Sequence, residues 1–527
     1  MLGKRLRPLS DAAPACDNGQ EARTKRRRAS TADNGCHDLD LLARLSDELV
    51  LRVLSFLDEG GLLEVSPVSR RLHRIASDSQ LWKAHFYSRF IKPRTHGTHR
   101  TAGRASAKTW WRLTPDGVDW KRQYRLRHNW QRGACAVQEM RVHEAGAAWE
   151  QPQTLVKVVQ GMAVTADAQA GLRAWDLRSR RLVAQTGLAT AQQPTCVAVD
   201  DQHLGAGWLD VATGFADGTF GTWRLHVKLG ALDARYTSQK QCEGELAAVA
   251  YSHPYVLTAT DRGYISLYEF KQDDVAAQTG PRQITELKSH SSRMPLALSI
   301  RRTAAAVVAS VAYTFDAGGG WAIGIQDLHV TTEGGLAGSR VAFTLPVQTR
   351  RQFGSQASSD FCTRAASPLE LDGSKRNNGS SSSSSSGPRR LCYRHPYMLV
   401  TLSDNTLLLH VCTASATALS IGPGVRLWGH TSGISDAEVT PRGRAVSVSM
   451  QGDEIRLWEL EGPKGSSVQV RPRQQQQQHQ PQQQPQQRKR TRCVGEARRN
   501  WVGFDEEMVV VLEKGEGGER LMVYDFA

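Results

Sequence analysis

The feature that most constrains the fold is a short strand-like ending that recurs seven times along the 527-residue chain. Each copy follows an alternating or apolar run, usually after a Gly/Asp turn such as ADGTF or SDNTL. The copies are AWDL (174–177), TWRL (222–225), LYEF (267–270), IQDL (325–328), LHVC (409–412), LWEL (457–460) and VYDF (523–526). The steps between equivalent positions are 48, 45, 58, 84, 48 and 66 residues, so the three short steps set a period near 47.

Each of the three longer steps contains a low-complexity insertion. The first contains KQDDVAAQTGPRQ, the second a Ser/Gly-rich segment at about 350–390, and the third a polyglutamine tract at about 462–496. Such segments do not need to pack. A period of about 40–50 residues with strands and turn signals is typical of a propeller with one four-stranded blade per repeat. We therefore predict a mainly β fold, with a seven-bladed propeller over residues 134–527.

The last repeat is one strand short. In the register of the repeats, the final segment LMVYDFA supplies only the third strand of its blade. The segment ACAVQEMRV (Ala134–Val142) precedes the first complete repeat and has the pattern of a strand. We predict that it forms the fourth strand of the last blade, because a shared blade protects both edges of the ring from open pairing.

The repeats resemble WD-repeat proteins, most closely in two units. The second unit has a strand hydroxyl, a turn aspartate and a tryptophan at the family's positions, and the sixth has the Gly-His and tryptophan ends with Ser447 or Ser449 between them. The resemblance implies that these side chains form a hydrogen-bonded structural network. Gln326 and His410 replace the tryptophan in two other units. The structural WD-repeat positions are Thr213, Asp217, Trp223, Trp175, Asp176, His430 and Trp458.

Residues 41–90 have a helical pattern of a different kind. Between Leu49 and Leu57 only Arg52 and Ser55 are polar, so this stretch is apolar on nearly all sides. A surface helix normally has one apolar stripe and one polar face. The pattern, punctuated at Gly60-Gly61 and Pro67, predicts short helices of about ten residues. A module of this size is too small to bury so apolar a helix by itself.

This module resembles the F-box, the most specific resemblance in the chain. It departs from the family at Ser46, where proline is usual, although a serine can cap the helix; Leu72 stands where tryptophan is frequent. The resemblance implies that the module binds the Skp adaptor of cullin–RING ubiquitin ligases. The expected adaptor-binding residues are Leu45, Ser46, Glu48, Leu49, Leu54, Leu57, Val68, Leu72, Leu81 and Trp82. The alternative is a helical core that packs on the propeller.

The net charge of +15 is concentrated outside the repeats. Residues 92–132 carry eleven Lys/Arg and two Asp, and residues 471–499 carry eight Lys/Arg and one Glu, so these two segments contribute +16 and the rest about −1. We therefore expect no nucleic-acid-binding face on the propeller. We interpret residues 91–133 as a basic linker. Its segment Trp120–Cys135 either packs the junction through Trp and Tyr while Arg stays solvated, or binds RNA, and we favour packing.

The N-terminal residues 1–40 are polar and rich in small residues, which predicts a disordered basic tail. The cluster Lys25, Arg26, Arg27 and Arg28 follows an earlier KRLR run, a spacing that is compatible with a nuclear-import signal. The chain has no stretch long and apolar enough for a membrane span and no signal-peptide pattern. We therefore expect a protein of the nucleus and/or cytoplasm.

No motif for catalysis is present. GxSxG, P-loop, HExxH and CxxC patterns are absent, and we expect no enzyme activity, cofactor or metal site. CYRH (392–395) and HVC (410–412) place Cys near His, but alternation along a strand sends near neighbours to opposite faces.

An F-box followed by a WD-repeat propeller resembles the substrate receptors of SCF-type ubiquitin ligases. We therefore expect a substrate-recognition subunit that docks the Skp adaptor and, through it, a cullin–RING ligase, with an unidentified protein substrate on the propeller. Arg173 and Arg456 precede the repeat endings, and their position on strands does not support a phosphate site. The alternative is a non-ligase WD-repeat scaffold for a protein or ribonucleoprotein assembly.

Overall fold

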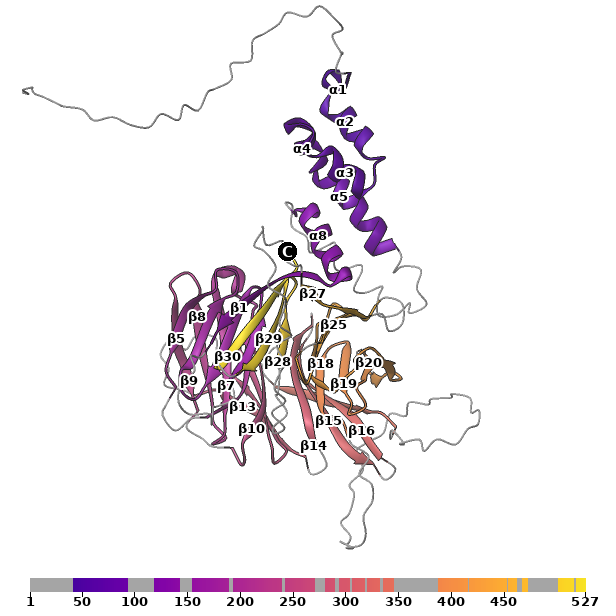
Figure 1. Cartoon of the computed structure of the whole chain (residues 1–527). Helices are drawn as coiled ribbons and strands as arrows, with labels where there is room; N and C mark the ends of the chain where they lie inside the picture. The colour runs from indigo at the N-terminus through magenta and orange to yellow at the C-terminus, as the bar shows by residue number, and fades with distance from the viewer. Residues whose placement is uncertain are drawn as a thin grey trace, which may run out of the picture. The chain divides into compact units, whose positions relative to one another are not determined.

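The computed structural model forms two compact units, residues 1–57 and 58–527, of which Figure 1 shows the ribbon. The described residues are 41–92, 118–142, 154–188, 193–238, 242–270, 280–289, 293–303, 306–317, 320–331, 335–345, 387–415, 417–452, 454–461, 467–472, 501–515 and 518–527. The tail at residues 1–40 and most of both large predicted insertions lie outside them.

The helices of the N-terminal module are shorter than predicted. The first unit contains α1 (Leu41–Arg44) and α2 (Asp47–Leu54). The second begins with α3 (Glu59–Val65), α4 (Arg70–Ala76), α5 (Ser79–Phe86) and the π-helix η1 (Tyr87–Ile91).

Side-chain caps set these helix starts. Asp58, Ser69 and Asp78 each accept a hydrogen bond from a backbone N–H in the first turn of the helix that follows. The expectation that Gly60-Gly61 separates two helices is wrong: both glycines lie inside α3, because the Asp58 cap starts the helix one residue before them.

Seven mainly antiparallel sheets follow, five of four strands and two of five among the described residues, which confirms the seven-bladed propeller. Blade 1 is β2 (Leu155–Val159), β3 (Met162–Asp167), β4 (Gly171–Asp176) and β5 (Arg181–Thr186). Blade 2 is β6 (Pro194–Asp200), β7 (Trp208–Phe215), β8 (Phe220–His226) and β9 (Ala231–Thr237), with the 3-10 turn η2 (Leu204–Ala206). Blade 3 is β10 (Leu246–Ser252), β11 (Tyr255–Thr260), β12 (Tyr264–Glu269) and β13 (Arg282–Lys288). Blade 4 is β14 (Arg293–Arg302), β15 (Val307–Ala317), β16 (Gly320–Val330) and β17 (Leu336–Phe343).

Of the remaining blades, 5 and 7 carry an additional short strand. Blade 5 is β18 (Arg390–Arg394), β19 (Tyr397–Thr401), β20 (Leu407–Ala414) and β21 (Leu419–Ile421), and β22 (Val425–Leu427) also pairs with β20. Blade 6 is β23 (Ile434–Val439), β24 (Arg444–Ser449), β25 (Ile455–Glu459) and β26 (Ser467–Gln469). Blade 7 contains β28 (Trp501–Phe504), β29 (Met508–Gly515) and β30 (Gly518–Asp525). All seven recurring endings include residues of the third strand of a blade.

The chain closes its own ring. Strand β1 (Ala134–Arg141) pairs antiparallel with β30 from Ala136↔Asp525 to Arg141↔Arg520 and completes blade 7, as predicted. The short strand β27 (Arg471–Pro472) pairs parallel with the start of β1. Figure 1 shows β1, in purple, beside the yellow C-terminal strands. Residues nearly 400 positions apart in the sequence therefore share one sheet.

A helix that the sequence analysis did not predict, α8 (Trp120–Arg132), leads directly into β1. Asp119 caps its start by accepting a hydrogen bond from the backbone N–H of Arg122 (3.0 Å). Gly133 ends it with φ +68, and a Cβ there would lie 2.2 Å from the carbonyl oxygen of Gln469. Only glycine fits this turn from helix to strand without displacing the neighbouring backbone.

The closing strand gives a direct stability test. Met140 of β1 is buried among residues of blades 7 and 1, whereas its neighbour Glu139 points outward and pairs with Arg520 at 3.4 Å. We expect Met140→Ala to lower the free energy of unfolding by about 2–4 kcal/mol, because it leaves a cavity in the core. Glu139→Ala is the control and should cost less than about 1 kcal/mol. Equal losses in urea unfolding would show that β1 does not close the core.

Candidate functional site

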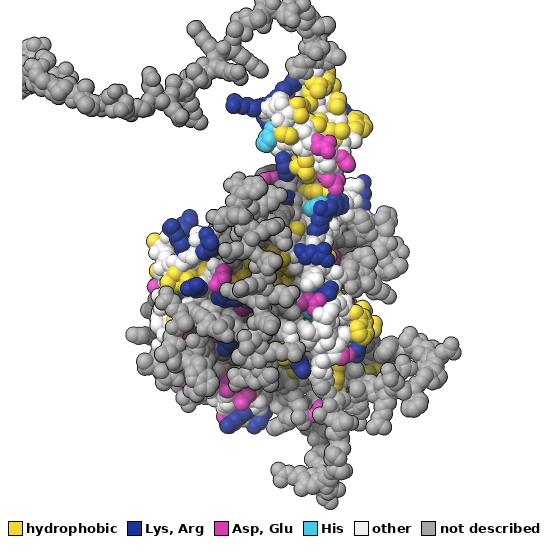
Figure 2. Space-filling view, viewed as in Figure 1, with side chains coloured by type: hydrophobic (Ala, Val, Ile, Leu, Met, Phe, Trp, Pro, Cys, Tyr) yellow, Lys and Arg dark blue, Asp and Glu magenta, His cyan; other side chains and the backbone are white. Residues whose placement is uncertain are grey.

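Helix α2 has two adjacent apolar stripes, of which one is buried and the other is exposed. Val50 and Leu54 are buried, at 2% and 4% exposure. Leu49 and Val53 of α2 are 54% and 49% exposed, and Phe56, in the turn that follows the helix, is 77% exposed. The helix is apolar on nearly all sides because one stripe is internal and the other faces outward, and Figure 2 shows hydrophobic side chains on the visible face of the helices.

Ser46 occupies the N-cap position of α2 without acting as a cap. Its backbone is extended, with φ −65° and ψ 159°, but its side chain makes no capping hydrogen bond. The pKa of the fully exposed Glu48 is lowered first by a backbone hydrogen bond at Glu48 and then by a hydrogen bond from the Ser46 hydroxyl. The expectation that Ser46 caps the helix is therefore wrong, and its φ angle equals the value that proline would impose.

The predicted adaptor-binding residues of the second unit are also partly exposed and partly buried. Val68 is 70% exposed, and Leu63, which was not predicted, is 55% exposed. Leu81 and Trp82 are buried, and the Trp82 indole N–H donates to the carbonyl of Ala76 at 2.8 Å. These two side chains, like Leu54 in α2, belong to the interior and not to a surface that a partner contacts.

The remaining predicted positions are at least partly accessible. Ser46 and Glu48 are exposed, and Leu45, Leu57 and Leu72 are half-buried. The exposed apolar residues that the sequence analysis missed are Leu42, Val53, Phe56 and Leu63. The spacing of Val53 and Phe56 from Leu49 was the signal that could have identified them.

Helix α8 packs against α5 and η1 through aromatic rings. Trp120 lies 5.4 Å from Phe86 and Tyr124 lies 5.2 Å from Trp82, measured between ring centroids. The Arg89 guanidinium donates to the Tyr124 hydroxyl at 2.6 Å. The expected packing of Trp and Tyr at this junction is confirmed, since Trp120, Tyr124 and Trp130 are all buried.

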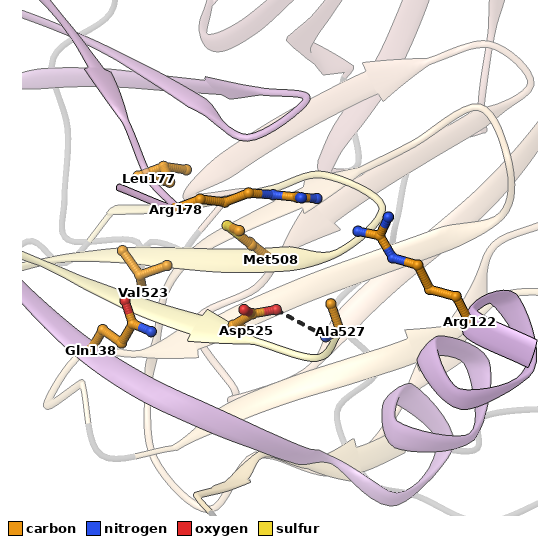
Figure 3. A pocket seen from close by; sticks show the side chains of 8 residues that line it. All are labelled: Arg122, Gln138, Leu177, Arg178, Met508, Val523, Asp525 and Ala527. Carbon is orange, nitrogen blue, oxygen red and sulfur yellow. Dashed lines mark hydrogen bonds between the residues drawn. The ribbon is translucent and has the colours of Figure 1, made fainter. Parts of the chain in front are cut away.

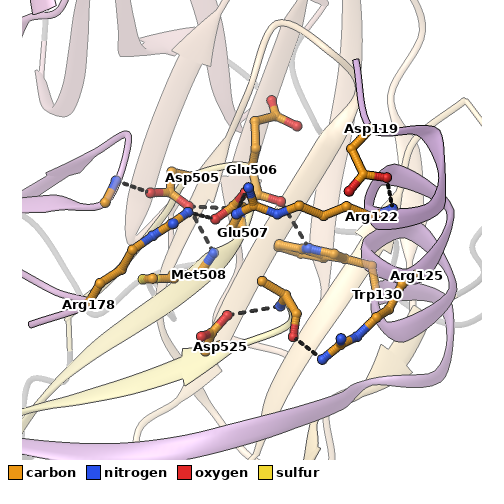
Figure 4. Close-up of polar contacts among 12 residues, drawn as sticks. Asp119, Arg122, Arg125, Trp130, Arg178, Asp505, Glu506, Glu507, Met508 and Asp525 are labelled. Atoms are coloured by element: carbon orange, nitrogen blue, oxygen red, sulfur yellow. Dashed lines mark hydrogen bonds and ion pairs between the residues drawn. The ribbon is translucent and has the colours of Figure 1, made fainter. Parts of the chain in front are cut away.

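The other side of α8 is attached to the propeller (Figure 4). Trp130 stacks on Phe526, with ring centroids 4.6 Å apart, and its indole N–H donates to the carbonyl of Glu506 at 3.2 Å. Asn129 donates to the carbonyl of Phe526 at 2.7 Å, and Arg127 pairs with Glu459 at 2.8 Å. Arg127 is 8% exposed, so the expectation that every arginine here stays solvated is wrong.

A cavity of about 220 Å³ lies beside the contact between α8 and the propeller (Figure 3). Arg122 of α8 and Arg178, which follows β4, both donate to the Glu507 carboxylate, with Arg122 at 2.7 Å. The charges at the cavity are thus used to hold α8, blade 1 and blade 7 together. The lining residues are Arg122, Gln138, Leu177, Arg178, Met508, Val523, Asp525 and Ala527.

The expected polar network within the blades is present in blade 6. The Trp458 indole N–H donates to the Ser447 hydroxyl at 2.8 Å, and this hydroxyl contacts His430 Nε2 at 2.6 Å. The structure therefore selects Ser447 over Ser449. In blade 1 the Trp175 indole N–H donates to Thr165 at 3.0 Å.

Blade 2, the closest sequence match, lacks this bond. The buried Thr213 hydroxyl has no hydrogen-bond partner among the described residues. Gly221 is opposite Thr213, and a Cβ there would lie 2.4 Å from the Trp223 ring, so the indole packs on the glycine. Asp217 and Asp176 both act in turns: Asp217 accepts from Thr219 N–H at 2.9 Å, and Asp176 accepts from Arg178 N–H at 2.9 Å.

The two repeat arginines have internal partners. Arg173 is buried and pairs with Asp167 at 2.8 Å, and Arg456 pairs with Glu454 at 2.6 Å. Each guanidinium is therefore held by a carboxylate of its own blade.

Burial favours the neutral forms of the Cys and His residues of blade 5, of which Cys412 and His410 are buried and Cys392 and His395 partly buried. Burial raises the pKa of Cys392 to about 11 and that of Cys412 to about 12. Burial also lowers the pKa of His395 to about 4. His410 Nδ1 donates to the carbonyl of Gly422 at 2.9 Å. The part of the chain that the structure describes contains no group of three or more potential metal ligands.

Two further predictions concern the nuclear-import signal and the absence of a membrane span. Lys25–Arg28 lies outside the described residues. None of the described helices has the length and apolar character that crossing a membrane requires.

Comparisons with known proteins agree with this architecture. Residues 135–527 match the family described as the F-box protein pof12 β-propeller, and residues 43–88 match the F-box-like family. The chain is 24% identical over 261 residues to the F-box protein dre-1 of Caenorhabditis elegans, a match that covers 46% of this chain and 25% of dre-1. The chain thus spans about a quarter of the length of that relative.

Two solved structures are also similar. The computationally designed Ika8 protein aligns with a TM-score of 0.35 and 13% identity over 71% of this chain and 83% of its own. The Cps50 (Swd1) β-propeller domain of Myceliophteria thermophila aligns with a TM-score of 0.40 and 8% identity over 74% of this chain and 99% of its own. Neither score is high enough to support an argument.

The geometry at Ser46 predicts that proline is favourable there. Ser46→Pro should stabilise α2 by about 0.4–1 kcal/mol, because the native φ already suits proline and the unfolded chain loses freedom. Ser55→Pro is a matched control: its φ is −66°, but its N–H donates to the carbonyl of Leu51 at 2.9 Å. It should destabilise the helix. Hydrogen exchange of α2 amides measures both changes, and the same sign for both would contradict this account.

The partly buried imidazole of His395 predicts a dependence of stability on pH. Its folded-state pKa of about 4 lies below the ordinary value of 6.5, so the unfolded chain takes up a proton first as the pH falls. His395 should therefore have no effect on stability above pH 6.5 and should lower it progressively between pH 6.5 and about 4. His395→Gln should flatten this part of the urea-unfolding profile, whereas the exposed His73→Gln should not. An unchanged profile in His395→Gln would refute the assignment.

Proposed function

Since this chain belongs to the family of F-box proteins with a pof12-type β-propeller, we propose that it is the substrate-recognition subunit of an SCF-type cullin–RING ubiquitin ligase. An F-box joined to a propeller supports the role of a substrate adaptor. In this proposal the F-box docks the Skp adaptor, and through it the cullin. The propeller binds the protein to be ubiquitinated, and the chain performs no chemistry itself.

The outward stripe of α2 is the observation that carries the proposal. Leu49 and Val53 of α2 and Phe56 in the turn that follows it are 54%, 49% and 77% exposed. Burying such a side chain is worth about 1.5–3 kcal/mol. A second protein that covers the stripe gains this free energy, less the cost of association. The F-box match at residues 43–88 includes this stripe, and it supports a Skp-type adaptor as that protein.

The propeller supports the second half of the proposal. Several of its buried carboxylates form internal ion pairs, as in Arg173–Asp167 and Arg301–Asp327. Its cysteine thiols in blade 5 are protonated near neutral pH, since burial raises their pKa. These groups hold the interior of the propeller together, and we assign the binding of the substrate to its surface. We place the protein in the nucleus and/or cytoplasm, with Lys25–Arg28 as the candidate import signal.

A pull-down with purified Skp adaptor tests the docking step. Leu49→Asp combined with Phe56→Asp should weaken adaptor binding at least about 100-fold, since two side chains of about 1.5–3 kcal/mol each lose their burial. Cullin, added together with the adaptor, should be lost with it. Leu54 is unsuitable for this test because it is buried, and a charge there would disturb the fold.

Leu229→Asp provides the control, because Leu229 is 79% exposed in the turn between β8 and β9. It should bind the adaptor as the wild type does. If the wild-type chain recovers neither adaptor nor cullin, the ligase proposal fails. Partners that are sensitive to nuclease would instead support a ribonucleoprotein scaffold.

A further inference from the structure

The end of the propeller opposite α8 carries an exposed tryptophan. Helix α8 binds the end where the first strand of each blade finishes, through Glu506 and Glu507 in the turn that follows β28. Arg390 begins the first strand of blade 5 and pairs with Thr401, at the other end of its blade. Leu427 lies at the same level, opposite Leu407. Trp428 follows directly and is 64% exposed.

Trp428 lies beside groups from the neighbouring turns of blades 5 and 6. The Arg426 guanidinium lies 5.6 Å from the centre of the Trp428 ring and donates to Asp404, in the turn before β20. Asn405 comes next, and its side-chain oxygen would lie 3.8 Å from a Cβ at Gly433. The same Cβ would lie 2.7 Å from the sulfur of Met450.

Arg389 also contacts Met450. Its Nη1 lies 3.3 Å from the Met450 sulfur. We name this surface the Trp428 surface; it consists of Arg389, Arg390, Asp404, Asn405, Arg426, Trp428 and Met450. It joins the neighbouring blades 5 and 6.

The Trp428 surface has more positive than negative charge available to a partner. Arg389 is exposed beside a thioether, which is only a weak acceptor. Arg390 is 46% exposed on its side chain and lies 3.9 Å from Asp436, which is buried. Asp404 is the exposed acidic group, and its bond to Arg426 holds that guanidinium over the indole. Among the described residues of this surface, three guanidiniums thus lie beside a single exposed carboxylate.

We infer that the Trp428 surface binds an acidic peptide segment, rich in Asp or Glu, that carries a large apolar side chain. Trp and Arg are the residues most often found at energetic hot spots of interfaces, and an indole offers a large area at low entropy cost. The apolar side chain of the peptide packs on Trp428, and its carboxylates pair with Arg389 and Arg390. The inference rests on the proposed function in one respect: the segment belongs to the substrate.

Selection from a random-sequence peptide library displayed on phage tests the inference with the full-length chain as bait. We expect enrichment of sequences that place Asp or Glu next to a large apolar residue. A synthetic copy of an enriched peptide should bind the wild type and lose at least tenfold in affinity to Trp428→Ala combined with Arg389→Ala. Affinity should also fall with added salt, because the charges are exposed.

Arg181→Ala combined with Leu229→Ala is the matched control, since both residues are exposed and lie by turns between third and fourth strands, at the α8 end. It should bind the peptide as the wild type does. Enrichment of basic or neutral sequences, no enrichment, or equal binding to both double variants would overturn the inference. The inference would also fail if a phosphoserine version of the peptide bound and the synthetic Asp/Glu version did not.

Adaptor pull-down of the same variants separates this inference from the proposed function. Both double variants should recover the Skp adaptor as the wild type does, because neither change lies in the F-box. A wild-type chain that binds the peptide but not the adaptor retains the Trp428 surface and loses the ligase role. A chain that binds the adaptor but enriches no acidic peptide retains the ligase role and overturns the inference.

Discussion

The pairing of β1 with β30 is the interaction on which the rest of the propeller depends. Six residue pairs join the segment before the first blade to the end of the last one. Without them, β30 and the first strand of blade 1 would not be linked into a ring, and an open sheet edge would be left. Since α8 ends at Gly133 and β1 begins at Ala134, closing the ring also fixes where α8 lies on the propeller.

The seam under α8 explains why a basic segment is needed there. Acidic groups of blades 6 and 7 face the helix, with Glu459 bound by Arg127 and Glu507 bound by Arg122. Arg127 is buried, so its partner is essential: removing one side of a buried pair leaves an uncompensated charge. Trp130 supplies the apolar part of the same contact by stacking on Phe526. The positive charge of this segment therefore serves contacts within the chain, at least in part.

Much of the fold was predictable because strand endings and turns are local signals. The recurring endings marked the third strand of every blade, and the incomplete last repeat indicated the closing strand. The role of α8 was not predictable in the same way, because Phe526 and Glu459 are more than 300 residues distant from it in the sequence. The F-box pattern identified the module but not which apolar residues face outward: Leu49 and Leu54 look equivalent in the sequence, and only packing distinguishes them. The Trp428 surface joins turns of two blades, so no single motif could reveal it.

The two ends of the propeller differ in the contacts that their charged side chains make. At one end, charged side chains are consumed by contacts within the chain, since Arg122 and Arg178 share Glu507. At the other end, Arg389 and Trp428 remain exposed. A guanidinium held by a short ion pair, such as Arg122 at 2.7 Å from Glu507, offers a ligand less than Arg390, which lies 3.9 Å from Asp436. A ring closed by its own N-terminal strand can thus dedicate one end to holding the helix that precedes it. The opposite end then stays free for a partner without any competition between the two roles.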